Sequence, residues 1–226
     1  FSFIIYNSET NEVFAARDRL GIKPFYYTQT SAGLIIASEI KSILASGVYN
    51  TQPDLFSLHT PVHYQTSPYT GFKNILKLKP GHILEYKNGN LRIEQYWKIN
   101  VSQKEISDSE AIEKLDYLLN DATRLQMIAD VPVGLLLSGG LDSSIIAALM
   151  KKQTNNDIHS FTIKFKASDL KKQGNVDDSF YAKKLATKLE LKHHEIEIDP
   201  DVVDLLPKMV YHLDEPLLTR LPLIHT

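Results

Sequence analysis

Short apolar stretches separated by polar turns fill the first hundred residues of the chain. They occupy residues 1–6, 13–16, 25–28, 34–37, 83–86 and 91–93. Runs of this length that are rich in β-branched and aromatic residues are typical of strands. The pair Asn88-Gly89 separates the last two runs, and Asn-Gly favours a two-residue hairpin turn. We therefore predict that residues 1 to about 98 form mostly antiparallel β-structure.

The pattern changes at residue 107, where Ser107 and Glu110 have the spacing of a helix capping box. Apolar residues then return every three or four positions, as on one side of a helix. The members of this predicted buried face are Ala111, Leu115, Leu118, Ala122, Leu125 and Ala129.

Strands and helices then alternate to the end of the chain. We expect strands at 133–137, 159–165 and 195–198, with helices after residue 144, at 179–189 and at 201–211. Such alternation predicts a parallel sheet, whose ligands bind beyond the carboxyl ends of the strands. Ser138, Lys164 and Phe165 would lie at that edge. The predicted fold combines an α+β domain at 1–100 with an α/β domain at 107–226, joined near 100–104.

Composition narrows the classes of function. A chain of 226 residues with 43% hydrophobic content can bury a sizeable core. The net charge of −2 and a pI near 6.5 give no electrostatic argument for a nucleic-acid or membrane partner. The absence of cysteine excludes disulfides and thiolate metal sites, and no apolar run reaches the roughly 18 residues of a membrane span. We expect a soluble, cytoplasmic protein.

The stretch with the strongest chemical signal is the apolar run 133–137 followed by Ser138-Gly139-Gly140-Leu141-Asp142-Ser143-Ser144 and an apolar helix. Glycines allow a tight turn, and N–H groups at a helix N-terminus attract an anion such as pyrophosphate. The lysine of a Walker A loop is missing. Asp142 is either a magnesium ligand or a helix-capping residue, and a flexible connector is the alternative for the whole loop.

This loop resembles the PP-loop of the ATP pyrophosphatases, which split ATP into AMP and pyrophosphate. The resemblance implies that ATP and Mg²⁺ bind here, with pyrophosphate contacts from Ser138, Gly139, Gly140, Asp142, Ser143 and Ser144. It places Leu137 and Ile163 near the adenine and ribose. Buried strand residues would have the same character, so both interpretations stay open.

The N-terminal part resembles the later half of the Ntn-type glutaminase domain of class II glutamine amidotransferases. The similarity lies in 16–27, in Ala37-Ser38-Glu39-Ile40-Lys41 and in Leu78-Lys79-Pro80-Gly81-His82. With the PP-loop behind it, the order is similar to that of glutamine-hydrolysing asparagine synthetases. Without the resemblance, Arg17-Asp18-Arg19 is typical of a solvated or mutually paired surface cluster.

The resemblance implies a two-site reaction with small-molecule partners, namely glutamine or ammonia, aspartate and ATP. It is also compatible with a homodimer. The chain contains no cysteine to act as the family's glutaminase nucleophile, and it begins with Phe1 inside an apolar run. The family's later Ser-Gly-Glu-Gly-x-Asp-Glu turn does not occur either. We expect a piece truncated at both ends that binds ATP weakly and does not turn over alone.

Some positions depart from the family pattern. His212-Leu213-Asp214-Glu215-Pro216 is similar to the family's His-x-Asp-Glu-Pro step, but 217–222 lacks the usual Asp and Ser. Asp177, Asp178 and Arg220 receive no role. Two alternatives remain: a related amidotransferase with another carboxylate acceptor, and a non-catalytic nucleotide-binding remnant. NAD synthetases and tRNA-modifying PP-loop enzymes lack the region at 17–24.

Overall fold

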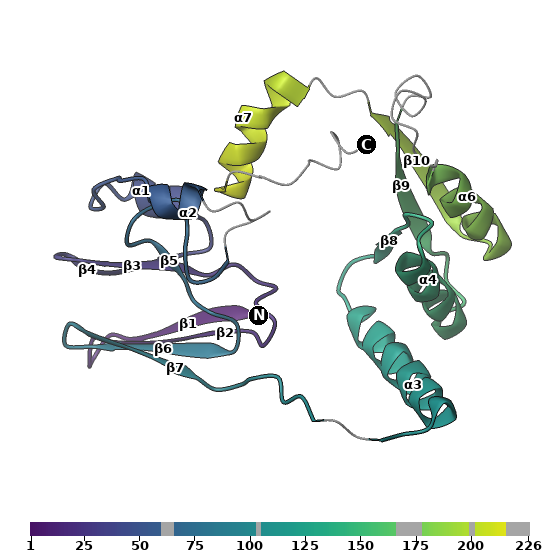
Figure 1. The fold of residues 1–226 in the computed structure, drawn as a ribbon, viewed down its shortest axis with the longest axis horizontal. Helices are drawn as coiled ribbons and strands as arrows, with labels where there is room; N and C mark the ends of the chain where they lie inside the picture. Colours follow the sequence, from purple (N-terminus) through teal and green to yellow (C-terminus); the bar gives the residue numbers. More distant parts are fainter. Residues whose placement is uncertain (60–65, 103–104, 166–177, 199–201, 216–226) are drawn as a thin grey trace. The chain divides into compact units, whose positions relative to one another are not determined.

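The computed structural model describes residues 1–59, 66–102, 105–165, 178–198 and 202–215 (Figure 1). Its contacts divide the chain into two compact units. The first unit contains the elements up to β7 together with α7, and the second contains the elements from α3 to β10. The domain ranges 1–100 and 107–226 stay a prediction.

An antiparallel sheet in the order β1-β2-β6-β7 forms one layer of the first unit. Its strands are β1 (Ser2–Asn7), β2 (Glu12–Arg17), β6 (His82–Lys87) and β7 (Asn90–Gln95). Asn88 and Gly89 join β6 to β7 with φ angles of 50° and 79°. Positive φ at both central residues is what a type I′ hairpin requires, so the predicted hairpin is confirmed.

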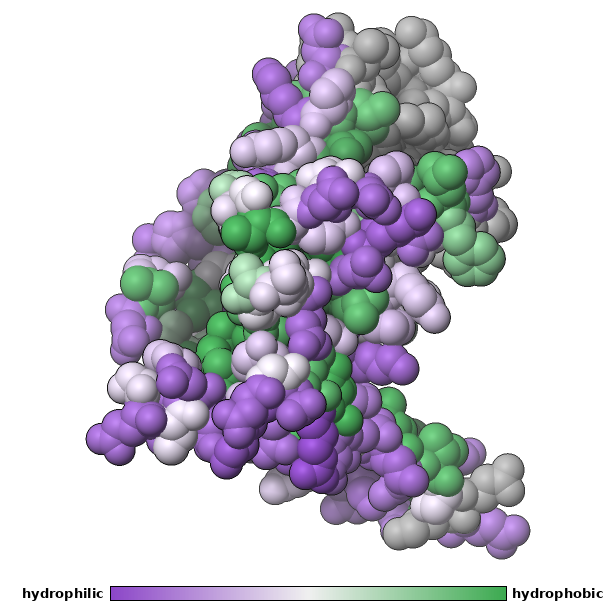
Figure 2. All heavy atoms as spheres, turned by 90° about the vertical axis from the view of Figure 1, so that its left-hand side faces the viewer, coloured by the Kyte–Doolittle hydropathy of each residue, from purple (hydrophilic) through white to green (hydrophobic). Residues whose placement is uncertain are grey.

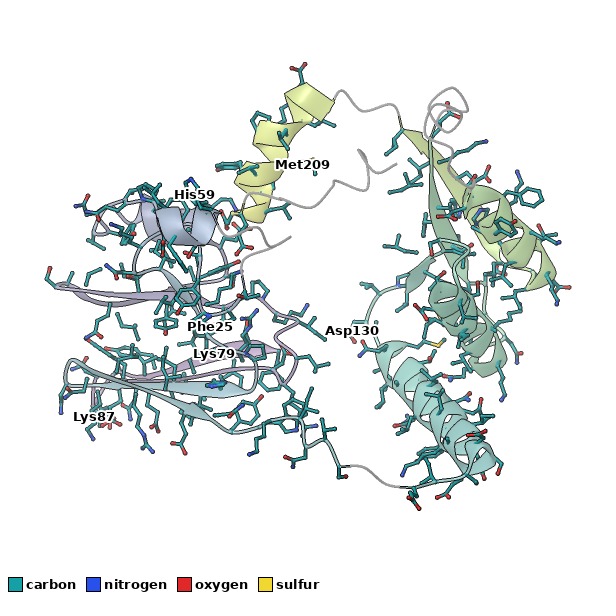
Figure 3. All side chains as sticks on the ribbon, in the orientation of Figure 1. Phe25, His59, Lys79, Lys87, Asp130 and Met209 are labelled. Atoms are coloured by element: carbon teal, nitrogen blue, oxygen red, sulfur yellow. The ribbon has the colours of Figure 1, made fainter. Side chains whose placement is uncertain are left out.

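A second antiparallel sheet lies against the first and has the order β4-β3-β5. It contains β3 (Tyr26–Thr30), β4 (Gly33–Ala37) and β5 (Leu76–Lys77). Figure 3 shows Phe25 between the sheets, where it is 3% exposed. The core there consists of Ala15, Phe25, Tyr27, Leu78 and Leu84. The prediction of mostly antiparallel β-structure over 1–98 is confirmed.

The opposite face of the second sheet is covered by α1 (Ile40–Ala45). Tyr27 faces the core between the sheets, whereas its neighbour Tyr26 packs toward Ile40 and Ile43. This is the alternation that a strand imposes on successive side chains. The sequence pattern did not predict α1 or α2 (Leu55–His59), because helices of five or six residues are too short to display a helical period.

Arg17 and Asp18 are buried at the end of β2, with exposed fractions of 9% and 8%. The Arg17 guanidinium donates to the carbonyls of Leu78 at 2.6 Å, Lys23 at 2.8 Å and Gly21 at 2.9 Å. The Asp18 carboxylate accepts from the backbone N–H groups of Leu20, Ile22 and Lys23 at 3.0 to 3.1 Å. The surface-cluster interpretation is therefore wrong for both residues, since backbone groups, and not solvent, satisfy these charges.

The second unit is built on a parallel sheet in the order β10-β9-β8, as the alternation of elements predicts. Its strands are β8 (Gly134–Leu136), β9 (His159–Phe165) and β10 (Lys192–Ile198). Two helices, α4 (Leu141–Gln153) and α6 (Asp178–Lys188), supply Ala147, Met150, Ala182 and Ala186 to the core that covers one face.

The helix α3 (Asp108–Gln126) begins at the predicted cap, where the Ser107 hydroxyl accepts from the Glu110 N–H at 3.3 Å. Its predicted buried face is wrong. Leu115, Leu118 and Leu125 are at least half exposed, whereas Thr123 is 4% exposed and Met127 packs against the core. Apolar residues occur on more than one side of α3, so periodicity alone did not identify the side that meets α4.

The helix α7 (Val202–Leu213) was expected at 201–211 and contains Pro207. It belongs to the first unit. Of the helices in the described part of the chain, none is both long enough and apolar enough to cross a membrane.

The hairpin ends of the first unit carry charged pairs. Lys87, labelled in Figure 3, pairs with Glu12, and Arg92 pairs with Glu94 at 2.6 Å. Figure 2 views the molecule from this side and shows mostly hydrophilic residues with hydrophobic ones between them. These exposed pairs contribute little to stability, so the buried Arg17 and Asp18 contribute more to the unit than these pairs do.

Replacement of Arg17 by Met removes the donor shared by the Leu78, Lys23 and Gly21 carbonyls. We expect the first unit to lose about 3 kcal/mol or more of unfolding free energy. Urea unfolding followed by the fluorescence of Trp97, the only tryptophan in the sequence, measures this. Arg92→Met, at a side chain that is 69% exposed, is the matched control. Equal losses in the two variants would contradict the role given to Arg17.

The pKa of Asp18 is about 2 instead of 3.8. Burial alone would raise it, but the N–H donors of Lys23, Ile22 and Leu20 outweigh burial and favour the ionised form. The lowered pKa stabilises the folded unit above pH 4, and this contribution disappears as the pH falls toward 2. We expect Asp18→Asn to be less stable at pH 7 and to show a flatter stability profile between pH 4 and 2. Parallel profiles for the two proteins would refute this.

Candidate functional site

The loop after β8 leads directly into α4, in the strand, turn and helix order that the sequence predicts. Leu137, the first residue of this loop, is hydrogen-bonded to the neighbouring strand β9. The Leu137 N–H donates to the Phe161 carbonyl at 2.9 Å, and the Thr162 hydroxyl donates to the Leu137 carbonyl. These bonds hold the start of the loop at the end of the parallel sheet, where ligands of such sheets bind.

Gly139 has a φ of +76°, which a residue with a side chain rarely adopts. A Cβ atom at this position would lie 2.7 Å from the Asp178 carbonyl oxygen and 2.9 Å from the Ala182 nitrogen. The loop thus packs against the beginning of α6 at a distance that only glycine permits. This contact contradicts the alternative of a flexible connector.

Gly140 is the N-cap of α4, with φ −71° and ψ 166°, and no side chain caps the helix there. Helix geometry leaves the first N–H groups, from Leu141 to Ser143, without an acceptor in the helix. The Ser144 N–H is the first to bond back, to the Gly140 carbonyl at 3.1 Å. The beginning of α4 therefore presents N–H donors and the positive end of a helix dipole to an anion.

The three serine hydroxyls of the loop make hydrogen bonds with one another and with the backbone of Gly140. Ser138 Oγ and Ser143 Oγ lie 3.0 Å apart at the helix N-terminus. Ser144 donates its hydroxyl to the Gly140 carbonyl at 2.6 Å. The Ser143 hydroxyl also donates to the Gly140 carbonyl, at 3.2 Å, and Ser138 Oγ accepts from the Gly140 N–H at 3.4 Å. Ser138 and Ser143 are thus brought together at the helix N-terminus, with all three hydroxyls hydrogen-bonded inside the loop.

Asp142 is exposed in the first turn of α4. It does not occupy the cap position, which belongs to Gly140, so the helix-capping alternative for this carboxylate finds no support. Among the residues that the structure describes, no three His, Asp or Glu side chains gather into a metal site. Any cation here would therefore depend on Asp142 together with oxygens of a bound phosphate.

The two residues expected near the nucleotide lie on opposite faces of the sheet. Leu137 is 1% exposed and belongs to the core beneath α4 and α6. Ile163 is 57% exposed and shares its face of β9 with Phe161, the partner of Leu136. Ile163 therefore has a surface that a ligand can contact, while the Leu137 side chain is enclosed.

Other expected positions are placed only in part. Lys164 lies near the end of β9, and Asp178 begins α6 with its carbonyl against Gly139. Asp177, Arg220 and the stretch 217–222 lie outside the described residues. The sequence analysis missed Thr162 and Ala182, which support the loop from β9 and α6. Both residues lie far from residue 139 in the sequence, so no local pattern indicates that they support the loop.

Comparison with known families assigns a match to each part of the chain. Residues 114–224 match a family model described as asparagine synthase. Residues 1–97 match one described as a glutamine amidotransferase domain. Together these ranges include the loop described above and both sheets of the first unit.

Three curated relatives are similar over nearly the whole chain. Asparagine synthetase (glutamine-hydrolyzing) 3 of Bacillus subtilis is 33% identical over 97% of the chain, and asparagine synthetase (glutamine-hydrolyzing) 1 of the same organism is 28% identical over 96%. Amidase chyE of Penicillium rubens is 31% identical over 96%. The chain spans 37%, 34% and 34% of the lengths of these relatives, in that order.

Replacement of Gly139 by Ala introduces a Cβ within 2.7 Å of the Asp178 carbonyl and strains a positive φ. We expect the second unit to lose about 2 kcal/mol or more of stability. Gly140→Ala is the matched control, because its Cβ would meet Ser138 Oγ at 3.4 Å and its φ is ordinary. It should cost at most about 1 kcal/mol. Thermal unfolding followed by circular dichroism, with hydrogen exchange of α4 and α6, distinguishes the two. Equal stability of both variants would show that the close packing is unimportant.

Proposed function

We propose that this chain, whose two parts match family models described as asparagine synthase and as a glutamine amidotransferase domain, supplies the pyrophosphate site of an enzyme that converts aspartate into asparagine at the expense of ATP. An oxygen of the aspartate side-chain carboxylate attacks the α-phosphorus of ATP, and the bond from that phosphorus to the bridging oxygen of pyrophosphate breaks. Ammonia from glutamine then attacks the aspartyl carbonyl carbon, and AMP departs.

The observation that carries this proposal is the uncapped N-terminus of α4 behind a loop that only glycine can form at residue 139. Negative charge builds on the pyrophosphate as it leaves the α-phosphorus. Preorganised N–H donors stabilise that charge without reorganising during the reaction. Leu141, Asp142 and Ser143 would donate their N–H groups, and Ser138 and Ser143 would add hydroxyl donors by rotating toward the ligand.

The residues present fit a magnesium nucleotide. Mg²⁺ is commonly held by one or two carboxylates together with phosphate oxygens, and Asp142 is exposed beside the proposed phosphate position. When bound, the cation would share the negative charge of the leaving pyrophosphate. Ile163, exposed on β9, is our choice for contact with the adenosine, and Leu137 would support the loop from below.

The amidotransferase part of this chain lacks the residue that would hydrolyse glutamine. The sequence contains no cysteine, so these 226 residues cannot hydrolyse glutamine through the family's cysteine nucleophile. We expect them to bind Mg-ATP and to form no asparagine alone. A homodimer stays a prediction.

A second candidate is an amidotransferase that amidates another carboxylate. It is favoured by the similarity to amidase chyE, whose 31% identity over 96% of the chain is close to that of the asparagine synthetases. The site at α4 would serve either acceptor equally, because it contacts pyrophosphate and not the carboxylate. The third interpretation is a remnant that binds nucleotide without catalysis.

Replacement of Asp142 by Asn tests the site in the chain itself. We expect affinity for Mg-ATP to fall about tenfold, because a charged metal contact is worth at least about 1.4 kcal/mol. Affinity for ATP without magnesium should not fall. Calorimetric titration measures both. Asp121→Asn, at an exposed ion pair on α3, should change neither affinity. Loss of affinity with and without magnesium would contradict the metal role of Asp142.

The reaction itself is tested in the longest protein that carries this chain, supplied with Mg-ATP and ammonia. Pyrophosphate and AMP are measured with and without aspartate. We expect both to depend on aspartate and to match the asparagine formed. Pyrophosphate release that ignores aspartate would favour the second candidate, and ADP as the product would refute adenylation.

A further inference from the structure

The residues that follow α7 form an acidic pair, Asp214 and Glu215, which contacts α1 and β5 within the first unit. Asp214 has a φ of +59°, in the left-handed region that ends many helices and that Asp tolerates better than most residues. Its carboxylate accepts from the N–H of Ile40 at 2.8 Å and of Lys41 at 3.3 Å. The side chain is 8% exposed, so these bonds are shielded from water.

The N–H groups that Asp214 binds belong to the beginning of α1, which its own sequence does not cap. Glu39 occupies the N-cap position with an extended backbone and makes no side-chain cap bond. It pairs instead with the Lys41 ammonium at 3.2 Å. Asp214 therefore supplies, from 174 residues along the chain, the acceptor that a cap residue normally provides.

Two lysines of the first unit complete the contact. The Lys41 ammonium lies 3.2 Å from Asp214 Oδ1 and 5.4 Å from the centre of the Tyr211 ring on α7. Lys77 of β5 pairs with Glu215, and both side chains are at least 86% buried. Each acid is thus matched by a lysine from a different element.

Tyr26 lies beside these charges on β3. Burial, and then the negative charges of Glu215 and Asp214, raise the pKa of its hydroxyl to about 12. The phenol therefore stays neutral at physiological pH and adds no charge to the cluster. Removing one member of a partly buried ion pair leaves the other uncompensated, which costs more than the loss of an exposed pair.

The two sides of this contact belong to different family matches. Asp214 and Glu215 fall within the range matched by asparagine synthase, 114–224. Ile40, Lys41 and Lys77 fall within the glutamine amidotransferase match, 1–97. We propose that Asp214 and Glu215 are positioning residues through which the ammonia-producing part holds a segment of the ammonia-consuming part. The contact itself does not depend on the proposed function, whereas its effect on the coupling of glutamine hydrolysis to asparagine formation rests on that function.

The contact is tested first in the 226-residue chain by hydrogen exchange. Asp214→Asn keeps the shape and tolerates the positive φ but loses the charge. We expect about a tenfold loss of protection at the Ile40 and Lys41 amides and in α7, with α4 and α6 unchanged. Asp121→Asn is the control, because its pair with Arg124 is exposed. Unchanged protection in Asp214→Asn would overturn the inference.

Charge exchange supplies a second, independent readout. Lys77→Glu and Glu215→Lys should each reduce the protection of α7 about tenfold, and the double variant should recover most of it. A role based only on side-chain packing would give additive losses in the double variant. Additive losses would therefore overturn the assignment of Glu215.

The consequence for coupling is measured in the longest protein that carries the chain, as asparagine formed per glutamine hydrolysed. Asp214→Asn should lower this ratio at least threefold while synthesis from added ammonia is retained. An unchanged ratio would refute the positioning role in coupling. Absence of asparagine from unaltered protein, with glutamine and with ammonia, would instead refute the proposed function and leave the exchange result intact.

Discussion

The first unit depends on the burial of two opposite charges at consecutive positions, Arg17 and Asp18. The Arg17 guanidinium donates to backbone carbonyls, and the Asp18 carboxylate accepts from backbone N–H groups. The backbone of the same pair is used as well, since the Asp18 carbonyl accepts from Gly81 and the Arg17 carbonyl accepts from the Tyr96 hydroxyl. The ends of β2 and β7 and the turn before β6 therefore meet at one point. With these segments fixed, β3 and its neighbour β4 are placed to receive α1.

Each unit contains a helix whose N-terminus is suited to an anion, but the source of the anion differs. A helix N-terminus presents N–H groups and a positive partial charge, which an anion satisfies. At α1 the anion is the Asp214 carboxylate, a permanent part of the chain. At α4 the cap residue is Gly140, without a side chain. One helix beginning is thus occupied by the protein's own acid, and the other is suited to a ligand.

Features determined by neighbouring residues were predictable from the sequence. The Asn88-Gly89 turn, the Ser107 cap and the strand, turn and helix around Gly139 each depend on a few consecutive side chains. Features determined by contacts between distant segments were not. The covered side of α3, the burial of Arg17 and the capping of α1 by Asp214 are set by tertiary packing, which periodicity does not encode. The candidate site residues were proposed from local chemistry, whereas the enclosure of Leu137 became evident only in three dimensions.

The contact between Gly139 and α6 links the loop after β8 to a helix that begins nearly forty residues later. A Cβ atom at Gly139 would meet the Asp178 carbonyl oxygen, the Ala182 nitrogen and Tyr181 Cβ, all within 2.9 Å. Two of these three atoms belong to the α6 backbone, so any change that moves α6 toward the loop would displace the loop as a side chain at 139 would. The position of α6 therefore requires glycine at 139. A substitution that shifts α6 could then alter the proposed affinity for a nucleotide without changing any residue of the loop.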